Sequence, residues 1–545
     1  MAPRKIMKLT PYFIIYFWIF YHAILTPIIC WDALIYHASL AKIFFIENKI
    51  PLIYGTSIGI QMGANYPPLF PSIGALLYVL SGGVNEVYLK MVAPISSLIT
   101  LTSVYLLSKT IYHRGSTIAH IATLILATTP LFIRYSFYAM SYMTCLSFMM
   151  ASLYVALETF RQKELTLRRF LLSGILFGFS LLSAYHVIYL IPIPLMIWCY
   201  ILNKLEPPKR QLYIMPLTLL MCLLIGGTWY LRNSILLNNP IYPIAYNLFD
   251  GKGLDSKLLA MTFEFNKWNG DVCSWGGSTS LIDDIIISLS FYNFFPSLFI
   301  ITTIVSLVYI ILTLNKRLFV LCIFPLLWAF TATFLVCHML FCFPRYFLFV
   351  IPFSTITLIA LLNEVKEQDQ NFIAILLSVM LLISPGLQAS FLGKVYVFCM
   401  YEKPPSNACY IFESIDKFEN LTRIDFWYPE VHLWMWLNNH VKENEKVATI
   451  ENRIYYLMGS NYTYLFMLDG IESKPLYEKP YDDPRKIVEF LCINRVKYIL
   501  DVSWARNTPQ WKNLPLVRYL GSEFFPLVYE TNCGKIYLVD CDKDN

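Results

Sequence analysis

Charged residues are scarce in this sequence. Asp, Glu, Lys and Arg make up 14% of its 545 residues and hydrophobic residues make up 57%, whereas soluble globular domains carry about 25% charged residues. Apolar runs of about 20 residues, the length that crosses a bilayer, recur from Pro11 to about Gln388 and then stop. A soluble protein is therefore excluded. We expect a multi-pass α-helical protein of the cell membrane with a water-soluble carboxyl-terminal part.

Three other features are missing, and each absence removes a class of function. The net charge of +6 is spread over short loops, without the basic stripe that nucleic-acid-binding proteins present. The 13 cysteines include no Cys-x-x-Cys pair at zinc spacing, so they indicate no metal or redox site. The carboxyl-terminal part has no Gly-rich phosphate loop, so a nucleotide-sugar donor receives no support. Cys533 and Cys541 flank one strand-like stretch. The sequence leaves two alternatives open for them: a disulfide, if this part lies in an outside compartment, or two free thiols.

The Lys and Arg residues between the apolar runs predict the topology. No small-residue cleavage site follows the first run, Pro11 to Cys30, so we interpret it as a retained span rather than a signal peptide. Ten further spans are expected at about 88–110, 116–134, 138–160, 169–186, 187–203, 212–231, 286–314, 317–337, 346–362 and 371–390. Every predicted inside loop carries Lys or Arg, as the positive-inside rule requires. About eleven spans, an odd number, place the carboxyl-terminal domain outside.

Two of the predicted outside loops are long, and long ordered loops usually carry function. They cover residues 31–87 and 232–284. The first contains an amphipathic stretch at 34–46, in which polar His37, Lys42 and Glu47 are interspersed with Phe44 and Phe45, as is typical of a helix lying in the membrane interface. Such a helix would hold Asp32 at the water boundary.

We divide the chain into a membrane domain at 1–390 and an extracytoplasmic α/β domain at 391–545. The expected strands of the second are Lys446–Ile450, Val496–Val502, Phe525–Tyr529 and Lys535–Val539, and the expected helices are Val431–Val441 and Arg485–Arg495. Asp483 followed by Pro484 is a good helix start. The alternation of strands and helices predicts a layered domain with a partly parallel sheet.

Four segments, in this order, resemble the GT-C superfamily of glycosyltransferases. They are WDALIYHASL at 31–40, YPPL at 66–69, TWYLRNSILLNNPIYP at 228–243 and PRY at 344–346. Within the superfamily they are most similar to the polyprenyl-phosphate-dependent branch, which includes protein O-mannosyltransferases and lipid A aminoarabinose transferases. Each segment alone is unspecific, but the four together with this topology are fairly specific. The resemblance covers most of the membrane part and the general layout of the tail.

The resemblance implies inverting transfer of a hexose, with mannose suggested by the resemblance alone, from a polyprenyl-phosphate donor in the membrane lipid to an extracytoplasmic protein or glycan acceptor. The family's general base, an Asp in the first outside loop, falls on Asp32. A carboxylate there can take the proton of an acceptor hydroxyl, a contribution of about 10²- to 10⁴-fold. Fixed cations can stabilise the departing phosphate. The candidates for the phosphate are Arg232, Arg345, Lys42 and Lys90, and those for the sugar or acceptor are His37 and Tyr66.

The sequence departs from the family pattern at two places. Ala33 follows Asp32 where much of the family has Glu, and the stretch Tyr138–Leu146 contains no acid. A two-carboxylate metal site is therefore in doubt, and the requirement for a divalent metal stays open. Candidates for a replacement second carboxylate are Glu47, Glu86, Asp271, Asp283 and Asp284. Tyr66 precedes Pro67 where the aminoarabinose transferases have Lys, which disfavours transfer of aminoarabinose.

The candidate residues also have purely structural interpretations. Asp32 would be a solvated residue at a loop start or a helix N-cap, and Arg232 and Arg345 would extend to lipid headgroups. Several others would only shape the chain or carry a modification. Pro67 and Pro68 would start a helix, Asn233, Asn239 and Pro240 would form a turn, and Asn420 and Asn461 begin N-x-T triplets that are consistent with glycosylation.

Two other classes of function remain as alternatives. A relative that has lost catalysis and acts as an assembly subunit is favoured by the missing second acid. A secondary transporter would share the many spans, but it predicts internal repeats and charges at mid-membrane, neither of which this sequence has. An oligosaccharyltransferase of the same superfamily would carry a WWDYG-type signature, which is missing from the tail.

Overall fold

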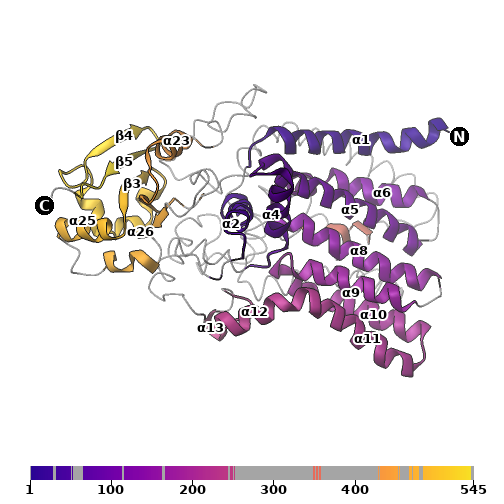
Figure 1. Ribbon diagram of the computed structural model, residues 1–545. Helices are drawn as coiled ribbons and strands as arrows, with labels where there is room; N and C mark the ends of the chain where they lie inside the picture. The colour runs from indigo at the N-terminus through magenta and orange to yellow at the C-terminus, as the bar shows by residue number, and fades with distance from the viewer. Residues whose placement is uncertain are drawn as a thin grey trace, which may run out of the picture. The chain divides into compact units, whose positions relative to one another are not determined.

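The computed structural model describes the helices of the amino-terminal half and an α/β domain near the carboxyl end (Figure 1). The described residues are 2–28, 32–50, 52, 66–112, 116–162, 166–242, 246–249, 251, 348–349, 351–353, 355–356, 428, 430–451, 453, 465–468, 471–477 and 483–541. They divide between two compact units. The first unit holds those within Met1–Ile24, Lys90–Leu231 and Trp275–Leu392, and the second holds those within Leu25–Leu89, Arg232–Ser274 and Gly393–Asn545. The boundary at residue 390 falls outside the described residues and stays a prediction.

Apolar helices make up the described part of the first unit. They are α1 (Ala2–Leu25), α5 (Glu86–Tyr112), α6 (Ser116–Thr128), α7 (Pro130–Tyr135), α8 (Ser141–Gln162), α9 (Leu167–Leu181), η2 (Tyr185–Leu190), α10 (Pro192–Leu205), α11 (Pro208–Cys222), η3 (Leu223–Gly227) and α12 (Thr228–Leu237). Among the described residues, four helical stretches are long and apolar enough to cross a membrane: Glu86–Thr110, Ser141–Gln162, Tyr185–Leu205 and Lys209–Leu237. They coincide with predicted spans. Most of the last four predicted spans lie outside the described residues, so the number eleven stays a prediction.

Small and hydroxyl-bearing residues hold these helices together, as is usual where lipid removes the hydrophobic driving force between helices. The Ser152 hydroxyl of α8 donates to the Ser173 carbonyl of α9 at 2.8 Å, and Trp198 Nε1 of α10 donates to Ser173 Oγ at 2.9 Å. A Cβ atom added at Gly178 of α9 would lie 2.8 Å from the carbonyl oxygen of Cys222. Only glycine therefore allows α9 and α11 to pack this closely.

The first predicted outside loop folds into three helices of the second unit. They are η1, a π-helix (Ala33–Ala38), α2 (Ser39–Glu47) and α4 (Leu69–Ser81). Pro68 is the N-cap residue of α4, so the two prolines start a helix as expected. Gly74 of α4 faces Ala41 of α2, because a Cβ at Gly74 would lie 2.8 Å from the Ala41 Cβ. The two helices are therefore in direct contact.

This packing corrects the prediction that the polar residues of the 34–46 stretch face water at the membrane interface. His37 and Lys42 are both buried, and Lys42 is only 4% exposed. The helix that begins after Pro67 and Pro68, α4, packs against this stretch, whereas the prediction had left its polar face without a protein partner. The stretch is helical as predicted, but it is an internal helix.

The carboxyl-terminal part forms a five-stranded mixed sheet with strand order β2-β1-β3-β5-β4. The strands are β1 (Lys446–Thr449), β2 (Leu465–Met467), β3 (Val496–Val502), β4 (Leu527–Thr531) and β5 (Gly534–Leu538). β1 pairs in parallel with β2 and with β3, whereas β5 pairs antiparallel with β3 and with β4. The partly parallel sheet is thus as predicted, and the strand missed by the sequence, β2, is only three residues long.

Helices accompany this sheet. They are α23 (Val431–His440), η7 (Ile471–Tyr477), α25 (Pro484–Ile493), η9 (Ala505–Asn507), α26 (Pro509–Lys512) and η10 (Pro515–Tyr519), while the short α13 (Tyr246–Phe249) belongs to the second long loop. Asp483 caps α25 as predicted, because its side chain accepts a hydrogen bond from the Arg485 N–H at 3.0 Å. The two helices predicted in this part are therefore present at the expected places.

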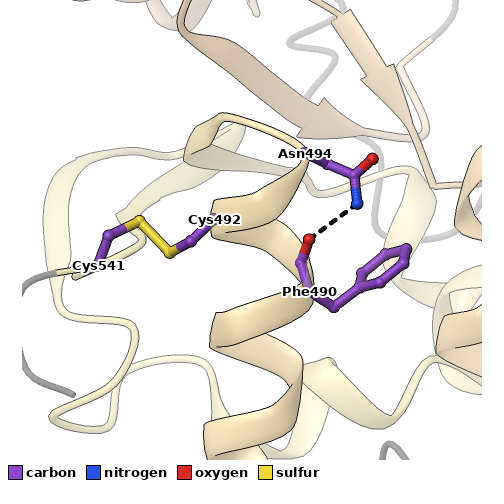
Figure 2. Close-up of a disulfide and its surroundings, with 4 residues drawn as sticks. All are labelled: Phe490, Cys492, Asn494 and Cys541. Atoms are coloured by element: carbon purple, nitrogen blue, oxygen red, sulfur yellow. Dashed lines mark hydrogen bonds between the residues drawn. A yellow bond between two sulfur atoms is a disulfide. The ribbon is translucent and has the colours of Figure 1, made fainter.

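The single disulfide among the described residues joins Cys492 at the end of α25 to Cys541 (Figure 2). The Asn494 side chain closes the same helix end by donating to the Phe490 carbonyl at 2.8 Å. Cys533 is buried and takes no part in a disulfide, so the considered pairing of Cys533 with Cys541 is wrong. The strand β5 separates the two, and its five extended residues span about 17 Å, far more than the 4.4 to 6.8 Å that a disulfide allows between Cα atoms.

Candidate active site

Asp32 is the first described residue of the helical stretch that follows α1. Its backbone already has helical angles (φ −63°, ψ −33°), and its side chain makes no capping hydrogen bond to η1. The residue is half-buried. Asp32 thus stands at the N-cap position of η1, as one structural interpretation expected, but its side chain does not make the hydrogen bond that a capping residue makes to the first turn. Its role as a general base stays a hypothesis.

Two further candidates follow Asp32 on the same helical stretch. The ring of His37 meets the ring of Phe70 edge to face, with centroids 5.6 Å apart. Lys42 lies on α2, and burial lowers the pKa of its amine to about 8, because the ammonium form loses its hydration. Ten residues separate Lys42 from Asp32, which is about 15 Å of helix. The two side chains are thus too far apart for an ion pair.

Tyr66 lies against this same stretch. Its ring centroid is 5.8 Å from that of Tyr36, which precedes His37. Phe70, in the first turn of α4, contacts His37 itself. The structure therefore brings Tyr66 and His37, the two candidates for sugar or acceptor binding, to one side of the Asp32 helix.

Arg232 belongs to α12, in a segment held by asparagine side chains. Its Nη1 donates to Asn233 Oδ1 at 2.7 Å, and Asn233 is buried. Asn238 ends the helix in the left-handed region (φ 60°), and Asn239 Oδ1 accepts from the Ile241 N–H at 3.0 Å. The predicted turn after the seventh span is therefore present, and Arg232 lies just before it.

Two basic candidates remain, Lys90 and Arg345. Lys90 of α5 belongs to the first unit, where it is buried and its Nζ donates to the Ile24 carbonyl at 3.4 Å. Arg345 lies outside the described residues, as do Asp271, Asp283, Asp284, Asn420 and Asn461. Of the other acidic candidates, Glu47 pairs with Lys49 at 2.9 Å.

Glu86, the last of these acids, has a structural partner. Its Oε1 accepts a hydrogen bond from the backbone N–H of Ile28. Ile28 lies four residues before Asp32, between the end of α1 and η1. Glu86 also belongs to the first turn of α5, where a negative charge favours the helix.

Sequence reasoning missed a buried charged cluster in the carboxyl-terminal part. Arg453 is fully buried, its Nε donates to Glu451 Oε1 at 2.8 Å, and its Nη2 donates to Glu430 Oε1 at 3.1 Å. Its guanidinium lies 5.1 Å from the ring centroid of Trp434 and 5.5 Å from that of Tyr428. These residues lie between positions 428 and 453, before, within and after the elements α23 and β1. The cluster depends on how these elements pack together, so no local spacing could have indicated it.

The described residues hold no cluster of three or more His, Cys, Asp or Glu side chains that could bind a metal ion.

One family model matches the sequence. This model describes the family of dolichyl-phosphate-mannose-protein mannosyltransferases, and it matches residues 65–229. The matched range begins just before Tyr66 and ends in the first turn of α12. No curated protein matches the sequence.

Solved structures match over nearly the whole chain. ArnT from Cupriavidus metallidurans in the apo state is 12% identical with a TM-score of 0.59, and the match covers 98% of both chains. The same protein bound to undecaprenyl phosphate is 13% identical with a TM-score of 0.58 and the same coverage. The archaeal oligosaccharyltransferase AglB from Archaeoglobus fulgidus, in complex with an inhibitory peptide and a dolichol-phosphate, is 12% identical with a TM-score of 0.51. That match covers 99% of this chain and 75% of AglB.

These matches agree with the apolar helices in describing a multi-pass membrane protein. At such low sequence identity the structural matches show the fold alone. The family model adds a similarity in sequence over one segment of the chain. The predicted resemblance to the GT-C superfamily of glycosyltransferases is confirmed, in the sequence of residues 65–229 and in the fold of the chain.

Proposed function

We propose that the protein is an inverting glycosyltransferase that moves a hexose, with mannose as the first candidate, from a polyprenyl-phosphate carrier to an extracytoplasmic acceptor. The observation that carries the proposal is the place of Asp32. It is the first described residue of the helical stretch that follows α1, in a chain with the GT-C fold. A half-buried carboxylate in this position suits a general base.

The proposed reaction is a single displacement at the anomeric carbon. The acceptor hydroxyl attacks this carbon while its proton passes to the Asp32 carboxylate, and the bond to the lipid phosphate breaks on the opposite face. Because attack and departure take opposite faces, the anomeric configuration inverts. General base catalysis of this kind contributes about 10²- to 10⁴-fold.

Basic residues would stabilise the departing lipid phosphate. Arg232 and Arg345 suit this role because a guanidinium matches two phosphate oxygens at once, and Lys42 and Lys90 would add compact charges. ArnT binds undecaprenyl phosphate and AglB binds a dolichol-phosphate, which supports a lipid phosphate as the carrier here. The matching family model is named for a mannosyltransferase, which supports mannose.

The acceptor would be a protein or a glycan outside the cytoplasm. AglB was solved with an inhibitory peptide, which favours a protein acceptor. The disulfide between Cys492 and Cys541 favours an oxidising compartment for the α/β domain, in line with the odd number of predicted spans. His37 and Tyr66, which lie on one side of the Asp32 helix, would bind the sugar or the acceptor.

The test is a reconstituted transfer reaction. The wild-type protein in liposomes receives labelled polyprenyl-phosphate mannose and a mixture of peptides and glycans from the outer surface of the source cells. We expect a labelled product whose anomeric configuration is opposite to that of the donor. Retention of configuration, or transfer from a nucleotide sugar but not from the lipid donor, would contradict the proposal.

An assembly subunit is the second candidate, because the stretch Tyr138–Leu146 lacks the second acid of the family. This candidate predicts binding of the lipid phosphate without any turnover. The same liposomes separate the two functions, since the subunit would retain labelled donor and release no labelled product.

A further inference from the structure

The backbone of Ile28 is held from both sides by distant side chains. Its N–H donates to Glu86 Oε1, and its carbonyl accepts from the Tyr428 hydroxyl at 3.2 Å. Glu86 belongs to the first turn of α5, whereas Tyr428 lies 400 residues along the chain from Ile28, just before α23. Ile28 itself is 1% exposed. The segment that leads to Asp32 is therefore fixed at one residue by the carboxyl-terminal part.

Tyr428 is held in turn by the buried charged cluster. The Arg453 guanidinium lies 5.5 Å from the Tyr428 ring centroid, within the range of a cation–π interaction. The Trp434 ring lies 5.9 Å from the same ring. Tyr428 is almost fully buried, so its hydroxyl has a defined direction.

The cluster is also attached to the sheet. The Glu451 N–H donates to Thr449 Oγ1 at 2.9 Å, and the Thr449 hydroxyl donates to the Leu500 carbonyl of β3 at 3.2 Å. Trp504 Nε1 donates to Glu451 Oε2 at 3.1 Å. A continuous series of buried contacts thus runs from β1 and β3 through Glu451, Arg453 and Tyr428 to Ile28.

A core that only stabilised the α/β domain would not need to extend to Ile28. This series of contacts reaches a backbone carbonyl four residues before Asp32, which is at most about 14 Å of chain. A general base must lie within about 2.6 to 3.2 Å of the group whose proton it takes, and a misplacement of about 1 Å can cost about 10²-fold in rate. Small movements of Ile28 therefore matter for the reaction.

We propose that Tyr428 is a positioning residue for Asp32, through which the carboxyl-terminal domain holds the start of the Asp32 helix in place. This inference rests on the proposed function, because it assigns Tyr428 a role in the transfer reaction. The domain then contributes to the rate of transfer itself, in addition to any contact that it makes with the acceptor.

The test compares Tyr428→Phe with the matched control Tyr529→Phe in the full-length protein. Tyr428→Phe keeps the ring and removes only the hydroxyl, and Tyr529 is a half-exposed tyrosine of β4 whose ring stacks on Trp436. We expect kcat to fall about three- to tenfold in Tyr428→Phe, as the loss of one hydrogen bond implies, with an unchanged KM for the lipid donor. Hydrogen exchange should rise in peptides that cover residues 24–36 and stay unchanged in those that cover β3 and β5. Tyr529→Phe should match the wild type in both measurements.

Each other outcome overturns the inference. An unchanged kcat with unchanged exchange at residues 24–36 would mean that the hydroxyl does not hold this segment. Faster exchange throughout β3 and β5, with kcat and KM both altered, would mean that Tyr428 only stabilises the domain. If the wild type itself transfers no sugar, the proposed function fails and the role in catalysis with it. The exchange measurement would still decide whether Tyr428 fixes Ile28.

Discussion

At the scale of single residues, burial gives Lys42 a property that its sequence position does not show. Its amine has a pKa of about 8, so it changes charge in a range where enzymes are readily assayed. Below pH 8 the amine is protonated and can attract a phosphate, and above pH 8 this charge is lost. The proposed role as a phosphate ligand thus predicts a measurable pH dependence.

The kcat/KM for the lipid donor should fall above pH 8 in the wild type, by about tenfold for each further pH unit, because only the charged form binds the phosphate. Lys42→Arg should remove this fall, because a guanidinium stays charged beyond pH 12. Lys49→Arg is the matched control, since Lys49 is exposed and pairs with Glu47, and it should keep the wild-type profile. A wild-type profile that is flat up to pH 10 would exclude Lys42 as a ligand.

Residue roles were predicted from the sequence only where the surrounding segment carried the information. Asp32 and His37 were proposed because they share the short segment 31–40 that resembles a family, and their roles stay predictions. Tyr428, Arg453 and Glu86 were not given their roles, because each acts through a contact with a distant part of the chain. Long-range pairing of this kind leaves no periodic signal in the sequence.

At the scale of elements, hydrophobic patterning predicted which helices and strands exist better than it predicted what surrounds them. The strands β1 and β3 and the helices α23 and α25 lie where alternation and helical spacing placed them. The stretch with His37 and Lys42 is helical as expected, yet its polar face is buried by α4. An amphipathic pattern shows that a helix has two faces, but it does not show what covers the polar one.

The disulfide of α25 gives a prediction at this scale. Tryptic digestion without reduction should release a peptide pair linked through Cys492 and Cys541, and Cys533 should be alkylated only after the protein is unfolded, because it is buried. The 49-residue separation corresponds to about 4 kcal/mol of stabilisation in the chain-entropy description. Cys492→Ser with Cys541→Ser should therefore lower the denaturation midpoint of the domain clearly.

The control for this measurement is Cys199→Ser, which changes an exposed cysteine of α10 and should leave the midpoint of the domain unchanged. A linked peptide that contains Cys533 would contradict the structure. If no linked pair forms in the native membrane, the domain does not lie in an oxidising compartment, and the proposed outside location fails.

At the scale of the whole molecule, the apolar runs predicted a multi-pass membrane protein, and the four segments that resemble the GT-C superfamily predicted its fold. Four predicted spans appear as helices long and apolar enough to cross a membrane, and the solved relatives match the chain over almost its full length. The compact units are not continuous in sequence, unlike the predicted domains. The second unit groups Leu25–Leu89 with Arg232–Ser274 and Gly393–Asn545. Spatial grouping of segments that are distant in sequence depends on tertiary packing, which hydropathy does not encode.

The central claim is that this molecule transfers a sugar with Asp32 as the general base, and one measurement tests it most directly. Membranes with equal amounts of wild type, Asp32→Asn and the control Glu443→Gln, which neutralises an exposed turn residue, receive labelled polyprenyl-phosphate mannose and the acceptor extract. We predict transfer by the wild type and by Glu443→Gln, and a loss of about 100-fold or more in Asp32→Asn. Equal transfer by Asp32→Asn and the wild type would contradict the account.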